Sequence, residues 1–227
     1  MSFPPRCITP LPVEPTIRDA TARGVAHPTL LRPKPQTGPL ILRVGFLGGT
    51  ADLHLKVLAY AQPWSDSAYL EFVPSSTSSA QIRVSFTPKL GNWSYIGQDS
   101  MHSSLLPDQP SMNLANLDSA TVLHEFGHAL GLDHEHQHPD TSITLNDQRV
   151  FDDMMRPPNS WSREQVKRNI LDRFTRTAVE TTPFDCLSVM IYQFPTAWLV
   201  AGSPIPANAR LSSGDIALVQ RLYGARP

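Results

Sequence analysis

The sequence predicts an α+β fold, in which a twisted mixed β-sheet is accompanied by helices and one helix carries a cluster of histidines. Three observations lead to this prediction. After residue 40, short apolar segments bounded by glycine, proline and serine are interspersed with helical patterns. Residues 124–136 read HEFGHALGLDHEH on a segment with helical spacing. The chain closes with a second amphipathic pattern over residues 211–223.

Five segments are expected to form strands because they are short, apolar or alternating, and end near turn-forming residues. They are residues 40–46, 69–73, 81–86, 93–97 and 111–114. In the third segment, the apolar residues Ile82, Val84 and Phe86 alternate with polar Arg83 and Ser85, which is typical of a half-buried strand.

Three further segments have the apolar spacing of helices. Residues 51–64, with Asp52 near their start, predict an amphipathic helix packed on the sheet. Residues 162–174 begin with the Ser-x-x-Gln pattern of a capping box. Near the start of residues 211–223, either Ser212 or Ser213 is suited to cap the last helix.

The histidine segment has the spacing of a catalytic zinc site. His124 and His128 are four residues apart, so a helix places both on one face, where two imidazoles bind one metal ion. Gly131 tolerates the left-handed conformation that ends a helix, after which His134 returns to the same metal. Glu125 is rotated about 100° from His124 and reaches a water molecule instead of the metal. Three neutral ligands leave a position for that water, which is typical of catalytic zinc.

Two alternatives concern the same region. An ordinary amphipathic helix could carry the histidines, but Leu123, Phe126 and Leu130 already supply an apolar face. The loop residues His136 and His138 either bind a second metal or serve as hydrogen-bonding partners.

The extended motif, with a methionine further along the chain, resembles the metzincin clan of zinc endopeptidases, and two details favour its astacin-like branch. Glu135 directly follows the third histidine, as in astacins. Residues 188–192 (SVMIY) resemble the astacin Ser-x-Met-His-Tyr Met-turn, with Ile191 in place of histidine. The resemblance implies that Met190 lies under the zinc, and that Tyr192 is a weak zinc ligand that moves to the transition-state oxyanion.

The resemblance covers roughly residues 40–224 and implies a zincin-like fold, with a zinc cleft between upper and lower parts of the domain. It implies a zinc-dependent endopeptidase that binds peptide substrates as an extended strand along the strand at residues 81–86. The alternatives are a zinc amide hydrolase with a single client, and a catalytically silent zinc protein that binds peptides. Glu125 disfavours the silent protein, because simple binding does not need a general base.

Residues 1–39 hold nine of the 22 prolines and predict an extended arm before a catalytic domain at residues 40–227. In this arm, Pro5-Arg6-Cys7 resembles the Pro-Arg-Cys segment that blocks the zinc of matrix metalloprotease precursors. Cys7 is therefore either a latch or an ordinary thiol of the arm. The second cysteine, Cys186, is expected to be a buried thiol.

Composition excludes several classes of protein. A net charge of −1 over 227 residues gives no electrostatic footprint for nucleic acid or an anionic membrane. Two cysteines allow at most one disulfide. No signal peptide or membrane-spanning apolar segment is visible, so we expect a soluble protein, taken to be a monomer, whose compartment stays open: inside the cell, exported by a non-classical route, or lacking its leader in this sequence.

Overall fold

The computed structural model describes residues 38–101 and 106–227, except residues 158 and 178. Five strands form one mixed sheet in the order β2-β1-β3-β5-β4. Three neighbouring pairs are parallel, and β4 pairs with β5 in the antiparallel direction. The strands are β1 (Leu40–Leu47), β2 (Leu70–Pro74), β3 (Ile82–Ser85), β4 (Trp93–Ser94) and β5 (Met112–Asn113). The predicted α+β fold is confirmed, although β4 and β5 are shorter than the segments expected.

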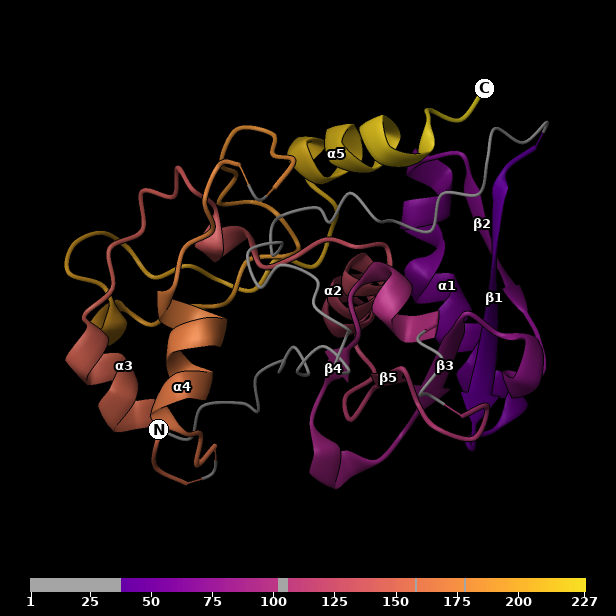
Figure 1. The fold of residues 1–227 in the computed structure, drawn as a ribbon, viewed down its shortest axis with the longest axis horizontal. Helices are drawn as coiled ribbons and strands as arrows, with labels where there is room; N and C mark the ends of the chain where they lie inside the picture. The colour runs from indigo at the N-terminus through magenta and orange to yellow at the C-terminus, as the bar shows by residue number, and fades with distance from the viewer. Residues whose placement is uncertain (1–37, 102–105, 158, 178) are drawn as a thin grey trace.

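Three helices lie beside this sheet (Figure 1). Helix α1 (Ala51–Ser67) packs on β2 and contacts both α2 (Ser119–Ala129) and α5 (Ser213–Tyr223). Short 3-10 turns connect the elements: η1 (Thr77–Ser79), η2 (Pro88–Leu90), η3 (Gly97–Met101), η4 (Glu135–Gln137) and η6 (Thr196–Trp198). None of the helices described is long and apolar enough to cross a membrane.

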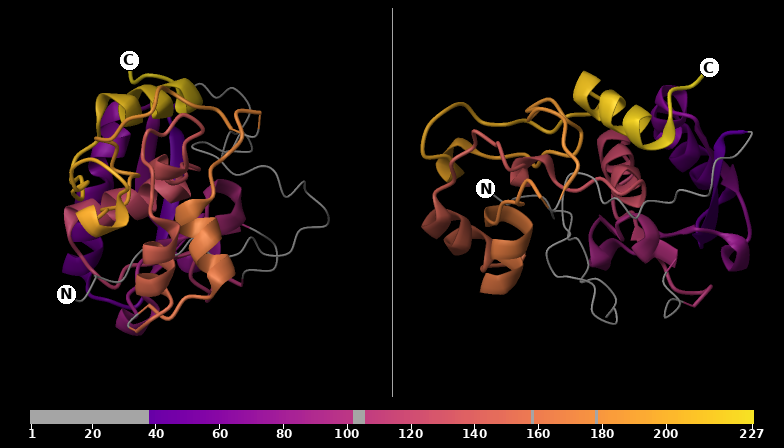
Figure 2. Two further views of the ribbon diagram at one scale, coloured as in Figure 1. Left: turned by 90° about the vertical axis from the view of Figure 1, so that its left-hand side faces the viewer. Right: turned by 45° about the horizontal axis from the view of Figure 1, so that its top comes forward.

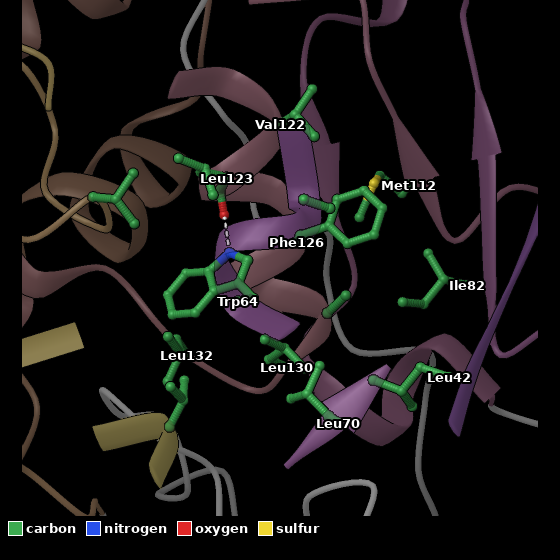
Figure 3. Close-up of a cluster of buried hydrophobic side chains, with 14 of the residues drawn as sticks. Leu42, Trp64, Leu70, Ile82, Met112, Val122, Leu123, Phe126, Leu130 and Leu132 are labelled. Carbon is green, nitrogen blue, oxygen red and sulfur yellow. Dashed lines mark hydrogen bonds between the residues drawn. The ribbon is translucent and has the colours of Figure 1, made fainter. Parts of the chain in front are cut away.

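The main core holds α2 against the sheet and α1 (Figure 3). The Trp64 indole N–H of α1 donates a 3.0 Å hydrogen bond to the carbonyl of Leu123, the residue before the first histidine of the motif. On the sheet side, the ring of Phe72 meets that of Phe126 edge-on at 4.9 Å between centroids. Because all four side chains lie in or against one apolar cluster, the helix that carries the histidines has little freedom to move.

A second apolar cluster organises the part of the chain between the histidines and α5, which lies apart from the sheet in the right-hand view of Figure 2. It contains α3 (Asp147–Met154), α4 (Arg163–Val166) and a π-helical turn, η5 (Lys167–Leu171). The predicted capping box between Ser162 and Gln165 is confirmed at the start of α4. Helix α3 was not predicted from the sequence, although Asn146 caps it and Val150, Phe151 and Met154 form a buried face.

Two expectations for the third strand are wrong. Strand β3 lies between β1 and β5 in the interior of the sheet, so it has no open edge for a substrate; the edge strand beside α2 is β4. The strand is also buried on both faces, and Arg83 is only 5% exposed. Its guanidinium donates to the carbonyls of Gln109, Ala80 and Ser100 at 2.8, 3.2 and 2.8 Å. These bonds replace the hydrogen bonds to water that the charged group loses on burial.

Candidate metal centre

Local sequence brings the histidine motif together at the end of α2. Asp118 caps the helix by accepting from the Thr121 N–H at 2.9 Å. At the other end, the Gly131 N–H donates to the His128 carbonyl at 2.7 Å and the Leu132 N–H donates to the Gly127 carbonyl at 2.9 Å. This pair of bonds is a Schellman motif, and Gly131 has the positive φ of 90° that it requires. The chain therefore reverses where the sequence predicted.

The reversal places the three predicted histidines in one buried group. His124, His128 and His134 are 9%, 0% and 0% exposed. One ring nitrogen from each lies within 4.8 Å of the other two, and no second group of this kind exists among the residues described. His128 Nε2 and His134 Nε2 are only 3.2 Å apart. This convergence is what one metal ion would require of its ligands.

Hydrogen bonds at Nδ1 of two of the imidazole rings show which ring nitrogen carries no proton. His124 Nδ1 lies 2.9 Å from the Val189 carbonyl, and His128 Nδ1 lies 2.8 Å from the Leu132 carbonyl. A carbonyl only accepts, so each Nδ1 carries the proton and each Nε2 keeps its lone pair. His124 Nε2 is buried without a hydrogen-bond partner. Such an atom costs free energy unless something binds it, so this donor set fits a metal ion such as zinc.

The protonation states suit a metal site as well. Burial lowers the pKa of His124 to about 4. Burial, together with repulsion from neighbouring histidines, holds the pKa of His128 and His134 well below their ordinary value. All three imidazoles are therefore neutral at pH 7, which is the form that ligates zinc.

The Met-turn, residues Ser188–Tyr192, lies against the histidines. Met190 is 1% exposed and packs against Gly127, in the last turn of α2. The Tyr192 ring lies 4.2 Å from the His134 ring and 6.1 Å from the His124 ring, between centroids. Glu125, beside His124 on α2, is 1% exposed. The structure therefore brings together the three histidines, Met190 and Tyr192, and buries Glu125 on the same helix.

The C-terminal helix holds the Met-turn in place through Asp215, a residue that sequence reasoning missed. Ser188 Oγ donates to Asp215 Oδ1 at 2.6 Å, and the Val189 N–H donates to Asp215 Oδ2 at 2.9 Å. Ser212 and Asp215 also form a capping box at the start of α5. The sequence signal for this cap is the Ser-Ser-Gly-Asp segment, but nothing in it indicated a contact with the Met-turn.

The residues after the third histidine form hydrogen bonds within the protein. His136 Nε2 donates to the Asn169 carbonyl at 3.1 Å, and His138 Nε2 donates to the Thr182 carbonyl at 2.8 Å. These bonds favour the hydrogen-bonding alternative over a second metal. Glu135 accepts from the N–H of Asp185, 50 positions further along the chain, at 2.8 Å. Burial raises the pKa of Glu135 to about 8.

The predictions for the two cysteines have different outcomes. Cys186 is exposed, so the expectation of a buried thiol is wrong. It precedes the exposed Leu187 in the segment that leads to the Met-turn, and its carbonyl accepts from the Asn208 side-chain amide at 3.1 Å. Cys7 lies outside the described residues, and its role as a latch stays a prediction.

Comparison with known proteins places these features in context. The family model described as Astacin, a family of peptidases, matches residues 50–223. A solved structure of myroilysin is 34% identical over 82% of this chain and 94% of its own, with a TM-score of 0.76. A second myroilysin crystal structure is 32% identical over 83% of this chain and 85% of its own, with a TM-score of 0.61.

A third solved structure is high choriolytic enzyme 1, a hatching-enzyme zinc protease from the medaka fish Oryzias latipes. It is 18% identical over 86% of this chain and 94% of its own, with a TM-score of 0.59. At this identity the likeness extends to the fold alone.

Proposed function

Since the chain belongs to the astacin family of peptidases and is a zinc metalloendopeptidase, we propose that its zinc is held by His124, His128 and His134 and that Glu125 is its general base. The observation that carries this proposal is the convergence of the three buried imidazoles, with His128 Nε2 and His134 Nε2 3.2 Å apart. When bound, zinc supplies Lewis acidity, which polarises a scissile carbonyl and lowers the pKa of a water molecule toward neutrality.

Glu125 takes the proton of the attacking water and later delivers it to the leaving amine. Its place in the chain supports this role, because the residue after His124 points about 100° away around the helix and so does not compete for the metal. Its burial supports the role as well, since a carboxylate in a site of low dielectric is a stronger base.

Tyr192 donates a hydrogen bond from its hydroxyl to the oxyanion that forms as the carbonyl is attacked. Its ring packs against those of His134 and His136, at centroid distances of 4.2 and 4.6 Å, which fixes its position beside the proposed zinc ligands. Met190 supplies an apolar floor to the site and takes no part in proton transfer.

The substrate is a peptide or protein, and we propose that it adds to the sheet as an extended strand along β4. The Tyr95 N–H donates to the Ser111 carbonyl at 2.9 Å, so Tyr95 faces β5 in the ladder. Because main-chain groups alternate along an antiparallel strand, the N–H and C=O of Ser94 face the open edge. Strand β4 contacts α2, which brings this edge to the helix that carries Glu125 (Figure 1).

The assignment of the ligands is tested by metal content and activity together. Wild-type protein should contain one zinc per chain and cleave unfolded casein, and a chelator should stop the cleavage. His128→Ala should lose zinc and activity. His138→Ala is the matched control, because it removes another fully buried histidine, hydrogen-bonded to the Thr182 carbonyl, and should keep the zinc. Full zinc content in His128→Ala would refute the assignment.

The domain division also stays a proposal. Strand β1 begins at Leu40, in agreement with a catalytic domain that starts there. If Cys7 latches the zinc, Cys7→Ala should show more activity than wild type; equal activities would exclude a latch.

A further inference from the structure

We propose that Asp215 is a positioning residue for the zinc site, which acts on His124 through Ser188 and the peptide group between Val189 and Met190. The inference rests on the proposed role of His124 as a zinc ligand. It adds that the basicity of this ligand is set from the C-terminal helix, 91 positions away along the chain.

Three hydrogen bonds connect the carboxylate to the imidazole, and the direction of each is fixed. Ser188 Oγ donates its one proton to Asp215 Oδ1 at 2.6 Å. The oxygen of that hydroxyl accepts from the Met190 N–H at 3.0 Å. The carbonyl of the same peptide group, that of Val189, accepts from His124 Nδ1 at 2.9 Å. No member of this chain could donate in the opposite direction, because the carboxylate and the carbonyl only accept.

Such a chain transmits polarisation. A hydroxyl that donates to a carboxylate becomes a better acceptor, and a peptide group that donates strongly from its N–H becomes a better acceptor at its C=O. The bond from His124 Nδ1–H is then stronger, which makes Nε2 a better electron donor to a metal. Asp215, Ser188, Val189 and Met190 are each 5% exposed or less, so water does not screen these bonds.

His124 differs in this respect from the other two ligands. His128 Nδ1 is bonded within its own turn, to the carbonyl of Leu132 four residues further along. His134 Nδ1 lies 3.7 Å from Asp133 Oδ1, which belongs to the residue directly before it. Of the three proposed ligands, therefore, His124 is the one whose Nδ1 is hydrogen-bonded to a segment remote in sequence.

The carboxylate is itself firmly placed. It accepts from the Ser212 N–H at 2.9 Å and from the Val189 N–H at 2.9 Å, in addition to Ser188. Helix α5 is anchored at its other end by the Tyr223 hydroxyl, which donates to the Leu130 carbonyl at 2.7 Å. Helix α5 thus connects the C-terminal end of α2 with the Met-turn, whose Val189 carbonyl bonds to His124. Figure 1 shows α5 above α2.

Zinc release from the holoenzyme tests the proposal. Ser188→Ala interrupts this series of hydrogen bonds but leaves the bond from Asp215 to the Val189 N–H in place. Its zinc should pass to a chelator about 10- to 100-fold faster than that of wild type. Asp215→Asn keeps the shape but removes the charge, and should also release zinc faster. The cobalt-substituted forms of both variants should show a shifted visible absorption band, because the ligand field of His124 is weaker.

Asn208→Ala is the matched control. Its side chain donates to the carbonyls of Ser188 and Cys186, at 3.0 and 3.1 Å, so it supports the same turn outside the chain to His124. It should release zinc within about twofold of the wild-type rate, with the cobalt band unchanged, because the ligand-tuning bonds are intact. The proposal is wrong if Ser188→Ala and Asp215→Asn release zinc at the wild-type rate, or if Asn208→Ala speeds release as much as they do.

Failure of this inference is distinguishable from failure of the ligand assignment. If His128→Ala loses zinc while Ser188→Ala holds it normally, the three histidines bind zinc and the link from Asp215 is refuted. If His128→Ala keeps its zinc, the ligand assignment itself falls.

Discussion

Met190 packs so closely against Gly127 that a Cβ atom added at Gly127 would overlap its sulfur. Glycine in the middle of a helix normally costs about 0.5–1 kcal/mol relative to alanine. At this position it admits the Met-turn to the surface of α2, with Trp64 behind it at 3.2 Å from the added atom. The helix gives up some intrinsic stability so that the floor of the site can sit directly beneath the histidines.

Gly127→Ala should therefore destabilise the protein, by about 1–3 kcal/mol, because overpacking outweighs the gain in helix propensity. The same substitution in a Met190→Ala background should be neutral or stabilising, since the obstructing sulfur is gone. Urea unfolding of the four proteins of this double-mutant cycle measures the coupling. Equal effects of Gly127→Ala in both backgrounds would contradict the packing described.

The stability of zinc-free protein should fall as pH rises because of Glu135. Burial raises the pKa of this carboxyl from its ordinary 4.5 to about 8, so the folded chain holds a proton that the unfolded chain releases. The stabilisation that this proton gives the folded chain is present in full below about pH 4.5, declines as pH rises, and is lost above about pH 8. Glu135→Gln stays neutral and keeps an acceptor for the Asp185 N–H.

The gap in unfolding free energy between Glu135→Gln and wild type should therefore grow from pH 5 to pH 8, in favour of the variant. Denaturant unfolding in the presence of chelator measures it, without the charge of a metal nearby. Glu164→Gln, at an exposed position on α4, is the control and should show a constant gap. If the difference in unfolding free energy between Glu135→Gln and wild type is also constant from pH 5 to pH 8, the Glu135 carboxyl is already ionised in the folded protein at neutral pH.

Arg83 should be irreplaceable by lysine. Its three bonds to buried or partly buried carbonyls join β3 to the segment around Ser100 and Gln109, and an ammonium group lacks the fork to reach all three. Arg83→Lys should lower the free energy of unfolding by about 2 kcal/mol or more. Arg43→Lys, on the neighbouring strand with an exposed side chain, should change it by less than about 0.5 kcal/mol. Equal losses of unfolding free energy in Arg83→Lys and Arg43→Lys would show that the buried hydrogen bonds of Arg83 add no more stability than an exposed arginine does.

The convergence of the three histidines was predictable from the sequence because its geometry is local. The spacing of His124 and His128 requires only a helix, and Gly131 with His134 requires only a turn at its end, so no distant contact had to be known. The five strands and the helices other than α3 were also found, within a few residues at most ends, from apolar periodicity.

What the sequence could not provide depends on contacts between distant segments. The place of β3 inside the sheet follows from its pairing with both β1 and β5, and alternation alone cannot distinguish such a strand from an edge strand. The burial of Arg83 depends on carbonyls up to 26 residues away. The link from Asp215 to Ser188 joins residues 27 positions apart and is likewise a product of the tertiary fold.

The most direct test of the central claim is turnover of unfolded casein by Glu125→Gln, with zinc measured on the same sample. The variant should contain as much zinc as wild type, since Glu125 is not a ligand, and should lose nearly all chelator-sensitive cleavage, since no group remains to take the proton of water. Cleavage at the wild-type rate by the zinc-loaded variant would contradict the account.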